Sequence, residues 1–357
     1  MTHNPYIGCL LGTAVGDSLG LPYEGLSAKR AAKLFPDTTK HHLFFGKGMV
    51  SDDTEHAAFV AQALIRSRGR GALGVNVNLF QKSLARSLRW WLLALPAGVG
   101  FATLRSILKL WLGFSPQTSG VYSAGNGPAM RIPILGVANG DNPEKLKQFV
   151  KASTEITHSD PKAYYAALAV ALAAHQSAGD EKPSPQRYLS TLKDLLPQGD
   201  AMELHELLQR AAVSAANGEP VTKFASDIGS KNGISGYSYH TVPCVLQVWF
   251  GEPEDFARGL QAIIKAGGDT DTAGAIFGGI VGTRVGREGI PEAWLSNIVE
   301  WPRTMSWLKR LGNAVAGAGQ SDAAKCPAYF IPGVLLRNLL FLIIVLAHGL
   351  RRLAPPW

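Results

Sequence analysis

The stretch GGDTDTAGAIFGGIVGTRVG, residues 267–286, joins an acidic, hydroxyl-rich start to a long run of small and apolar residues. Asp269 and Asp271 stand two positions apart behind a pair of glycines, and further glycines recur through the run that follows. This composition favours a helix, and glycines on a helix let a neighbouring backbone approach closely, as they do in membrane helix pairs. The stretch therefore predicts a tightly packed helix with carboxylates at its start.

The rest of the chain is also helical in pattern. Residues 161–179 run from a proline start to a glycine end, and residues 253–268 repeat this arrangement. Residues 54–67 carry a stripe of apolar side chains at helical spacing, made of Ala57, Ala58, Ala61, Leu64 and Ile65. Loops are expected at three stretches rich in turn residues: 35–48, 123–130 and 178–187. With no strand–helix alternation and no fixed repeat, we expect one large, orthogonal all-α domain over residues 1–357.

Composition places the chain among compact globular proteins. It has 357 residues, 46 % of them apolar, which is enough to form a large core. Its three scattered cysteines, Cys9, Cys244 and Cys326, favour neither a disulfide framework nor a zinc site. The first residues, MTHNPYIGCLLG, show no basic segment with a long apolar run, so we expect no signal peptide and a cytoplasmic protein.

The charge of the chain is unevenly distributed. The formal net charge is +8, and no acidic residue stands between Glu55 and Asp141. This interval holds Arg66, Arg68, Arg70, Lys82, Arg86, Arg89, Arg105, Lys109 and Arg131. Such a stretch attracts phosphates or an acidic partner, and an ordinary solvated basic face is the alternative. No nucleic-acid-binding motif accompanies it, so we expect no nucleic acid partner.

The segment at 335–357 combines apolar and basic residues. Its uninterrupted apolar run, Leu339 to Ala347, is nine residues long, whereas a membrane span needs about 20. We therefore expect a buried or interfacial helix followed by a tail, and contact with a membrane surface is the less favoured alternative.

A second acidic cluster, SDDT at residues 51–54, resembles the start of the first stretch. Taken singly, each cluster could cap a helix, but together they hold more carboxylates than caps need. Adjacent carboxylates repel one another unless a cation neutralises them, and hard divalent cations prefer oxygen ligands. The available oxygens belong to Ser51, Asp52, Asp53, Thr54, Asp269, Asp271 and Thr272. Without His or Cys, such ligands favour Mg²⁺ or Mn²⁺ over Zn²⁺, and four carboxylates suffice for two ions.

Five blocks of sequence point to a known family when they are taken together. In chain order they are GCLLGTAVGDSLGLPYE (8–24), SDDT (51–54), SAGNGPAMR (123–131), THSDP (157–161) and AGGDTDTAGAIFGGIVG (266–282). In this order they resemble the ADP-ribosylglycohydrolase family, which includes the dinitrogenase reductase-activating glycohydrolase and the ADP-ribosylarginine hydrolases. The resemblance extends from residue 7 to about residue 286, which is most of the chain.

The resemblance implies an all-α fold with a di-metal cleft. It implies two Mg²⁺ ions, with Mn²⁺ as the alternative. By carry-over, the ligands on one side are Ser51, Asp52 and Asp53, with serine replacing a threonine of some relatives. The ligands on the other side are Asp269, Asp271 and Thr272. Asp53 and Asp271 are expected to be required for catalysis.

Further site residues follow from the same resemblance, each beside an ordinary structural alternative. Glu24 corresponds to an acidic residue near the scissile bond, and otherwise it is a solvated loop residue. Residues Gly125, Asn126 and Gly127 would cradle a diphosphate, or form a simple tight turn. His158 would donate to a phosphate or ribose oxygen, or belong to a helix cap region. Tyr237 and Tyr239 would stack on adenine, or pack in the core or a lid. Asp17 is expected to have a supporting structural role.

The resemblance implies hydrolysis of ADP-ribose attached through its anomeric carbon, most simply from arginine of an ADP-ribosylated protein. A guanidine leaves poorly, so a proton donor is needed, and Glu24 or a metal-bound water would serve. Serine-linked or small-molecule ADP-ribose adducts are alternative substrates. A different class of function is an immunity protein that binds and occludes an ADP-ribosyltransferase toxin.

Overall fold

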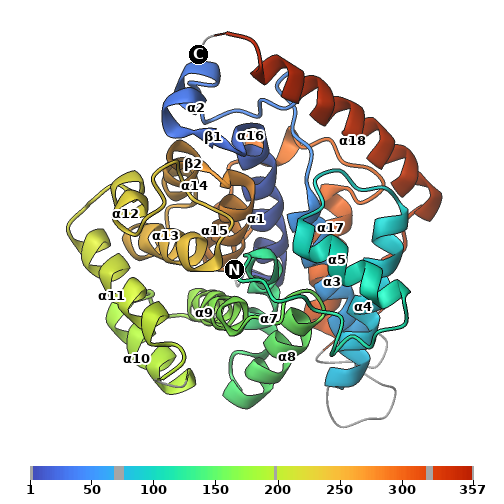
Figure 1. Ribbon diagram of the computed structural model, residues 1–357, viewed down its shortest axis with the longest axis horizontal. Coiled ribbons are helices and arrows are strands. Elements are labelled where there is room, and N and C mark those ends of the chain that lie inside the picture. Colours follow the sequence, from blue (N-terminus) through green and yellow to red (C-terminus); the bar gives the residue numbers. More distant parts are fainter. Residues whose placement is uncertain (1–2, 68–75, 197–198, 319–324, 356–357) are drawn as a thin grey trace.

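The computed structural model describes residues 3–67, 76–196, 199–318 and 325–355 (Figure 1). The helices are α1 (Pro5–Gly20), α2 (Ala28–Leu34), α3 (Asp52–Arg66), α4 (Val77–Leu93), α5 (Phe101–Trp111), α6 (Gly127–Met130), α7 (Pro133–Asn139), α8 (Pro143–Glu155), α9 (Pro161–Ala178), α10 (Pro185–Leu195), α11 (Met202–Ala216), α12 (Val221–Asp227), α13 (Ser238–Gly251), α14 (Phe256–Ala266), α15 (Thr270–Val285), α16 (Glu292–Ser296), α17 (Met305–Gly317) and α18 (Ile331–Arg352). A 3₁₀ turn, η1 (Leu21–Tyr23), and two short strands, β1 (Leu26–Ser27) and β2 (Gly267–Gly268), complete these elements. The prediction of an all-α fold is confirmed.

Helices α1 and α15 form the centre of the fold and run antiparallel, with glycine facing glycine. A Cβ atom built on Gly12 would lie 2.1 Å from the carbonyl oxygen of Gly278. One built on Gly16 would lie 1.9 Å from the carbonyl oxygen of Gly274. Real Cβ atoms do not approach so closely, so only glycine allows the two backbones to touch. The predicted tight packing of this glycine-rich helix is confirmed, and its partner is the first helix of the chain.

The other three helices predicted from sequence are present with small changes in their ends. Helix α9 ends one residue before the predicted 161–179, the predicted 253–268 contains the shorter α14, and α3 ends one residue before the predicted 54–67. The predicted stripe of Ala57, Ala58, Ala61, Leu64 and Ile65 is buried, but every other side chain from Asp53 to Ile65 is buried too. The reason is that α3 packs against helices on several sides, including α1, α4 and α17.

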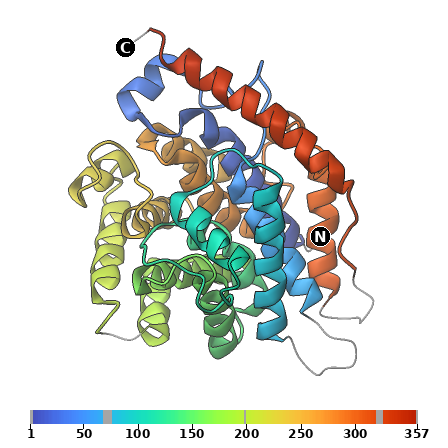
Figure 2. The same ribbon diagram turned by 45° about the vertical axis from the view of Figure 1, so that its right-hand side comes forward.

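A layer of helices surrounds the central pair (Figures 1 and 2). Helices α3 and α17 pack against α1, whereas α9, α13 and α14 pack against α15. At one end of the pair, Thr270 Oγ1 donates to the carbonyl of Gly20 at 2.9 Å, and β1 pairs antiparallel with β2. These contacts fix the C-terminal end of α1 beside the N-terminal end of α15, where both acidic clusters meet.

Arg131 belongs to the basic interval without acidic residues, between Glu55 and Asp141, but it does not reach the surface. Arg131 is fully buried, and its Nη2 atom donates to the carbonyl of Ser153 and to the hydroxyl of Thr157, each at 2.8 Å. The expectation of a basic surface along this interval is therefore wrong for Arg131, whose hydrogen bonds hold buried residues together. Other members are exposed on α4 and α5, namely Lys82, Arg86 and Arg105, and Arg68 and Arg70 lie outside the described residues.

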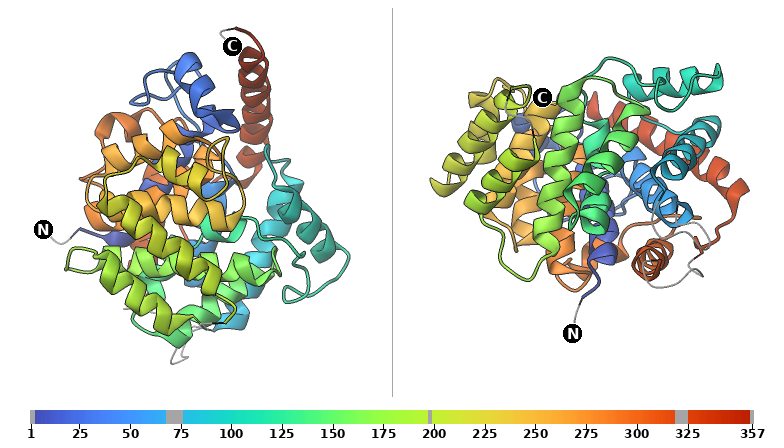
Figure 3. Two further views of the ribbon diagram at one scale, coloured as in Figure 1. Left: turned by 60° about the vertical axis from the view of Figure 1, so that its left-hand side comes forward. Right: turned by 90° about the horizontal axis from the view of Figure 1, so that it is seen from below.

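Helix α18 lies along the outside of the body, on the same side as α4 and α5 (Figures 1 and 3). It has 22 residues, and by length and composition alone it could cross a membrane. It lies against the body, yet only 39 % of its most apolar window is buried. Phe341 and Ile344 pack from this helix against Leu21, Leu43 and Met49.

Candidate active site

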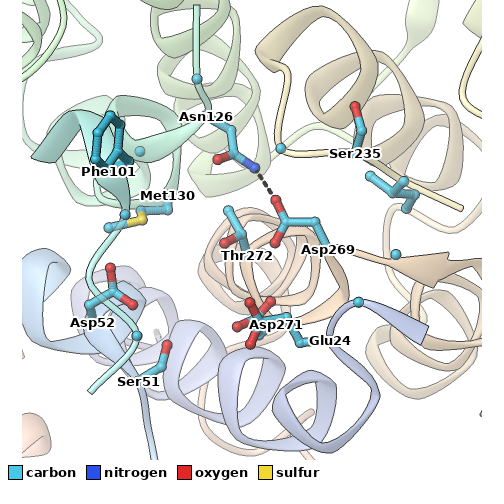
Figure 4. Close-up of a pocket in the computed structure, with 18 of the residues that line it drawn as sticks. Glu24, Ser51, Asp52, Phe101, Asn126, Met130, Ser235, Asp269, Asp271 and Thr272 are labelled. Atoms are coloured by element: carbon cyan, nitrogen blue, oxygen red, sulfur yellow. Dashed lines mark hydrogen bonds between the residues drawn. The ribbon is translucent and has the colours of Figure 1, made fainter. Parts of the chain in front are cut away.

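The two acidic clusters open onto one cavity of about 900 Å³ (Figure 4). The C-terminal end of α1 and the N-terminal ends of α3, α6 and α15 surround it. Ten of the site residues expected from the sequence line it: Glu24, Ser51, Asp52, Gly125, Asn126, Gly127, His158, Asp269, Asp271 and Thr272. Helix N-termini carry partial positive charge and unpaired N–H groups, so this arrangement favours anionic groups at the cavity wall.

The start of α3 is held by Asp17 of α1. Ser51 is the N-cap residue, and its hydroxyl accepts from the backbone N–H of Asp53 at 3.3 Å. The carboxylate of Asp17 accepts from the N–H of Ser51 at 2.9 Å and from the hydroxyl of Thr54 at 2.5 Å. Burial raises the pKa of Asp17 to about 6, although these hydrogen bonds act in the opposite direction. Asp17 therefore positions the SDDT cluster, in agreement with the supporting role expected for it.

The start of α15 is arranged so that its first aspartate faces the cavity. Asp269 stands at the N-cap position, and its Oδ2 atom accepts from Asn126 Nδ2 at 2.6 Å. The same Asn126 amide donates to Thr241 Oγ1 at 3.0 Å, which fixes its orientation. Asp269 is thus directed across the cavity towards the glycine-rich turn, and the hydrogen bond to Asn126 joins the two sides of the site (Figure 4).

Asp53 and Asp271 are buried and incompletely hydrogen-bonded. Asp53 Oδ2 accepts from the hydroxyls of Ser51 at 3.0 Å and Thr272 at 3.4 Å. Among the described residues, neither Asp53 Oδ1 nor Asp271 Oδ1 has a hydrogen-bond partner. Burial raises the pKa of both carboxyls well above the usual value for aspartate, and neighbouring carboxylates raise it further. Buried oxygens without partners are costly, so a ligand for them is expected.

A hard divalent cation suits this set of ligands. All the donor atoms are carboxylate or hydroxyl oxygens, and positive charge would offset both the repulsion and the missing hydrogen bonds. In the part of the chain that the structure describes, no three acidic, histidine or cysteine side chains form a compact metal cage by themselves. The hydroxyls of Ser51 and Thr272 would therefore be needed to complete the ligand shells.

Glu24 stands at the rim of the cavity. Its side chain is exposed, but the protein around the carboxyl and the charge of Asp269 raise its pKa, and Arg352 opposes this shift. The guanidinium of Arg352 also donates to the backbone carbonyl of Glu24. Glu24 is thus a carboxyl with a raised pKa beside the acidic cluster, which suits a proton donor.

The glycine-rich turn packs directly against His158. A Cβ atom on Gly125 would lie 3.0 Å from His158 Nε2, and one on Gly127 would lie 3.1 Å from His158 Cε1. His158 Nδ1 lies 2.9 Å from Thr157 Oγ1. Burial and the charge of Arg131 lower the pKa of His158 to about 3, so the ring is neutral at pH 7. The N–H groups of Gly125 and Asn126 donate to Ser123 Oγ at 3.3 Å and to the carbonyl of Gly236 at 3.0 Å, so a phosphate would meet the N–H groups at the start of α6 beside this neutral ring.

The two tyrosines expected to stack on adenine do not line this cavity. Tyr239 is fully buried, and Tyr237 packs at 5.9 Å from it, measured between ring centroids. Lys162 Nζ donates to the hydroxyl of Tyr237 at 3.0 Å. Both rings border a separate hollow beside α11, so they fit the alternative of core aromatics. Their adenine-stacking role is not supported by this geometry.

Several lining residues were not anticipated from the sequence. They are Phe101 and Thr103 of α5, the turn at 229–236, and Phe341 and Val345 of α18. The turn has the Gly, Ser and Asn composition of any loop, and the apolar residues resemble ordinary core positions. Only their place in the folded chain shows that they border the site.

The family match supports the chemistry of this cavity. Residues 2–324 match the sequence model of the ADP-ribosylglycohydrolase family. The chain belongs to the ADP-ribosylglycohydrolase family. Its expected family resemblance is confirmed, and membership supports hydrolysis of an ADP-ribosyl bond as its activity. ADP-ribosylglycohydrolases match it over the acidic clusters and the glycine-rich turn, but α18 lies beyond the matched residues.

Two curated ADP-ribosylglycohydrolase relatives illustrate the similarity. The ADP-ribosyl-[dinitrogen reductase] glycohydrolase of Rhodospirillum rubrum is 27 % identical, over 83 % of this chain and 90 % of the relative. The human ADP-ribosylhydrolase ARH3 is 26 % identical, over 80 % and 87 %. A solved structure, an ADP-ribosylglycohydrolase-related protein complex, has a TM-score of 0.64 and 24 % identity, covering 89 % of this chain and 98 % of the solved one. This structural likeness shows a shared fold.

Proposed function

We propose that the protein is a metal-dependent hydrolase that removes ADP-ribose from arginine side chains of modified proteins. The observation that carries this proposal is the meeting of two acidic clusters at one cavity, with buried carboxylate oxygens that lack protein partners among the described residues. Two Mg²⁺ ions would be held by Ser51, Asp52 and Asp53 on one side. Asp269, Asp271 and Thr272 would hold them on the other. When bound, the ions would supply Lewis-acid chemistry at the ribose hydroxyls.

The opposite wall of the cavity suits the diphosphate of ADP-ribose. Gly125 and Gly127 line the cavity without side chains, and the neutral ring of His158 packs against them. Backbone N–H groups at a helix start favour phosphate oxygens. The diphosphate would therefore bind on the glycine side, and the ribose would reach the acidic side.

The acidic side also suits the bond to be cleaved. A guanidine leaves poorly unless it receives a proton, so cleavage of an arginine adduct needs a proton donor beside the acidic cluster. Glu24 retains its proton to higher pH than an ordinary glutamate, and it could donate that proton to the departing guanidine nitrogen. Asn126 would keep Asp269 in place during this step through its hydrogen bond.

A direct test measures release of ADP-ribose from two peptides, one modified on arginine and one on serine. We expect faster release from the arginine peptide with Mg²⁺ present, and loss of release after EDTA, with recovery when Mg²⁺ is restored. Faster release from the serine peptide would overturn the linkage, and full activity in EDTA would overturn the metal dependence. The unmodified peptides serve as blanks.

A second prediction concerns the glycine-rich turn. Gly127→Val places a branched side chain against His158 Cε1, which lies only 3.1 Å from the Cβ position. We expect affinity for ADP-ribose to fall by about tenfold or more, because the backbone can no longer approach a phosphate. Calorimetry with ADP-ribose measures the change, and Gly317→Val, in open space at the end of α17, is the control. Unchanged affinity in Gly127→Val would remove this turn from the site.

A further inference from the structure

Helix α18 presents a wide apolar side to solvent, whereas it buries Arg337, Asn338 and His348 together with a few apolar residues. A helix on the surface of a soluble protein normally exposes its polar side chains. The exposed positions of α18 include Leu336, Leu339, Leu340, Ile343, Leu346 and Leu350. Its buried positions combine Val334, Phe341 and Ile344 with Arg337, Asn338 and His348. Exposed leucines over buried polar side chains are the pattern of a helix whose outer surroundings are apolar.

The buried polar side chains of α18 fix the orientation of the helix. Arg337 pairs with the buried Glu300, and its Nη2 atom also donates to the carbonyl of Val50 at 2.5 Å. Asn338 Nδ2 donates to the carbonyl of Ala94 at 2.8 Å. Rotating the helix to bury its leucines would leave Glu300 charged, buried and unpaired, which is strongly unfavourable. The leucine-rich face therefore stays directed outwards.

The exposed apolar surface continues beyond the helix. Where α18 begins, Trp301 packs against Phe330 with 5.9 Å between ring centroids, and both rings are about half exposed. Leu95, next to the residue that Asn338 binds, is 57 % exposed. Exposed apolar residues gathered in this way mark an interaction site, whereas singly scattered ones do not.

Basic residues surround the far end of this surface. Arg351 is exposed, and Lys29 of α2 is exposed nearby, where Arg30 Nη2 donates to the carbonyl of Arg352 at 2.5 Å. The sequence contains no acidic residue after Asp322. Leucines flanked by basic residues match a bilayer surface that offers hydrocarbon and anionic headgroups together.

We propose that the outer face of α18 docks on an anionic lipid surface, with the helix axis lying in the plane of the interface. A spanning orientation would pull Arg337, Asn338 and His348 away from their partners and into hydrocarbon. A second copy of the chain packed in parallel is less suitable, because it would bring the two basic ends together. The proposal goes beyond the hydrolase function and does not depend on it. Because Phe341 and Val345 of the same helix line the cavity, docking would also place that cavity beside the lipid surface.

Vesicle co-sedimentation of the full chain tests this proposal. The probes are vesicles of phosphatidylcholine alone and vesicles with about one third phosphatidylglycerol. We expect binding to the anionic vesicles that weakens at high salt. The triple variant Leu336→Ser, Ile343→Ser, Leu350→Ser should lower the partition coefficient by at least about tenfold. The matched control is Met202→Ser with Val213→Ser, which removes exposed apolar side chains from α11 and should leave binding unchanged.

Two further measurements make the outcome decisive. Circular dichroism and thermal unfolding show that the triple variant is folded, and its rate on a soluble substrate should equal that of the wild type, because none of the three residues lines the cavity. Absence of wild-type binding to anionic vesicles would overturn the proposal. So would a wild-type dimer in light scattering that the triple variant converts to a monomer without any vesicle binding, since that result would assign the face to a second copy.

Discussion

Replacing Asp271 by asparagine is expected to reduce the rate of ADP-ribose release by at least about a thousandfold while leaving the fold intact. Asp271 is buried, and its Oδ1 atom has no hydrogen-bond partner in the described part of the chain. The substitution keeps the volume of the side chain but removes one negative charge and one anionic oxygen from the proposed metal site. Release from the arginine-modified peptide at saturating Mg²⁺ measures the effect.

The stability of the same variant provides an independent readout. In EDTA, Asp271→Asn should be more stable than the wild type, because burial and neighbouring carboxylates disfavour the charged form of Asp271. The folded-state pKa is raised, so the folded chain binds more protons than the unfolded chain above about pH 4. The wild type should therefore lose free energy of unfolding as pH rises from about 4, and the variant should lose less.

A matched control is available for these measurements. Asp194→Asn makes the same substitution at an exposed position on α10, and both activity and stability should stay unchanged. Near-wild-type activity of Asp271→Asn would contradict the site assignment. A variant that is less stable than the wild type in EDTA would show that the carboxylate is stabilising without a metal.

Gly12→Val is expected to destabilise the folded protein severely, because it forces apart the two central helices. Its Cβ atom would lie 2.1 Å from the carbonyl oxygen of Gly278. Because the atoms it meets are backbone, they cannot move aside as a flexible side chain would. We expect a loss of at least about 4 kcal/mol in the free energy of unfolding, and a fall in the melting temperature of roughly 5 °C or more. Failure to accumulate as folded protein would agree with this expectation.

A glycine-to-valine substitution at an unpacked helix position separates the effect of the steric clash on stability from the effect of helix propensity. Gly349→Val lies within α18, and no described atom outside the helix's own backbone lies within 4 Å of its Cβ position. Its melting temperature should remain close to that of the wild type, because valine is not a worse helix former than glycine. Gly278→Val, on the partner helix, should reproduce the loss seen for Gly12→Val. Equal stability of Gly12→Val and the wild type would contradict the close approach of the two helices.

The sequence allowed much of the acidic site to be predicted because carboxylate chemistry depends on residue type. Repulsion within each cluster indicated a cation, and the resemblance of five sequence blocks to a known family placed Asp52 and Asp269, far apart in the chain, at one site. The tyrosines show the limit of this reasoning. An aromatic residue in a sequence fits a stacking platform and a core equally well, and only the buried position of Tyr239 separates the two.

The fold was predictable in its class but not in its pairings. The glycines in residues 272–286 predicted that another helix packs closely against this one. A glycine has no side chain, however, so the sequence did not show which helix that is. The exposure of the leucines of α18 could not be predicted from the sequence for a related reason. Hydropathy summed along residues 335–357 does not reveal that Arg337 and His348 point inwards, because that depends on their partners Glu300 and Pro22.

The pairing of α1 with α15 has a consequence for biosynthesis. The first helix leaves the ribosome early, but its partner follows only after most of the chain has been translated. At about 5–20 residues per second, Gly12 waits roughly 13 to 53 seconds before Gly278 is made. Throughout that interval, residues 5–20 form an apolar segment without its native neighbour, of the kind that molecular chaperones bind. The yield of this protein in a cell therefore depends on how well its nascent N-terminal segment is protected during translation.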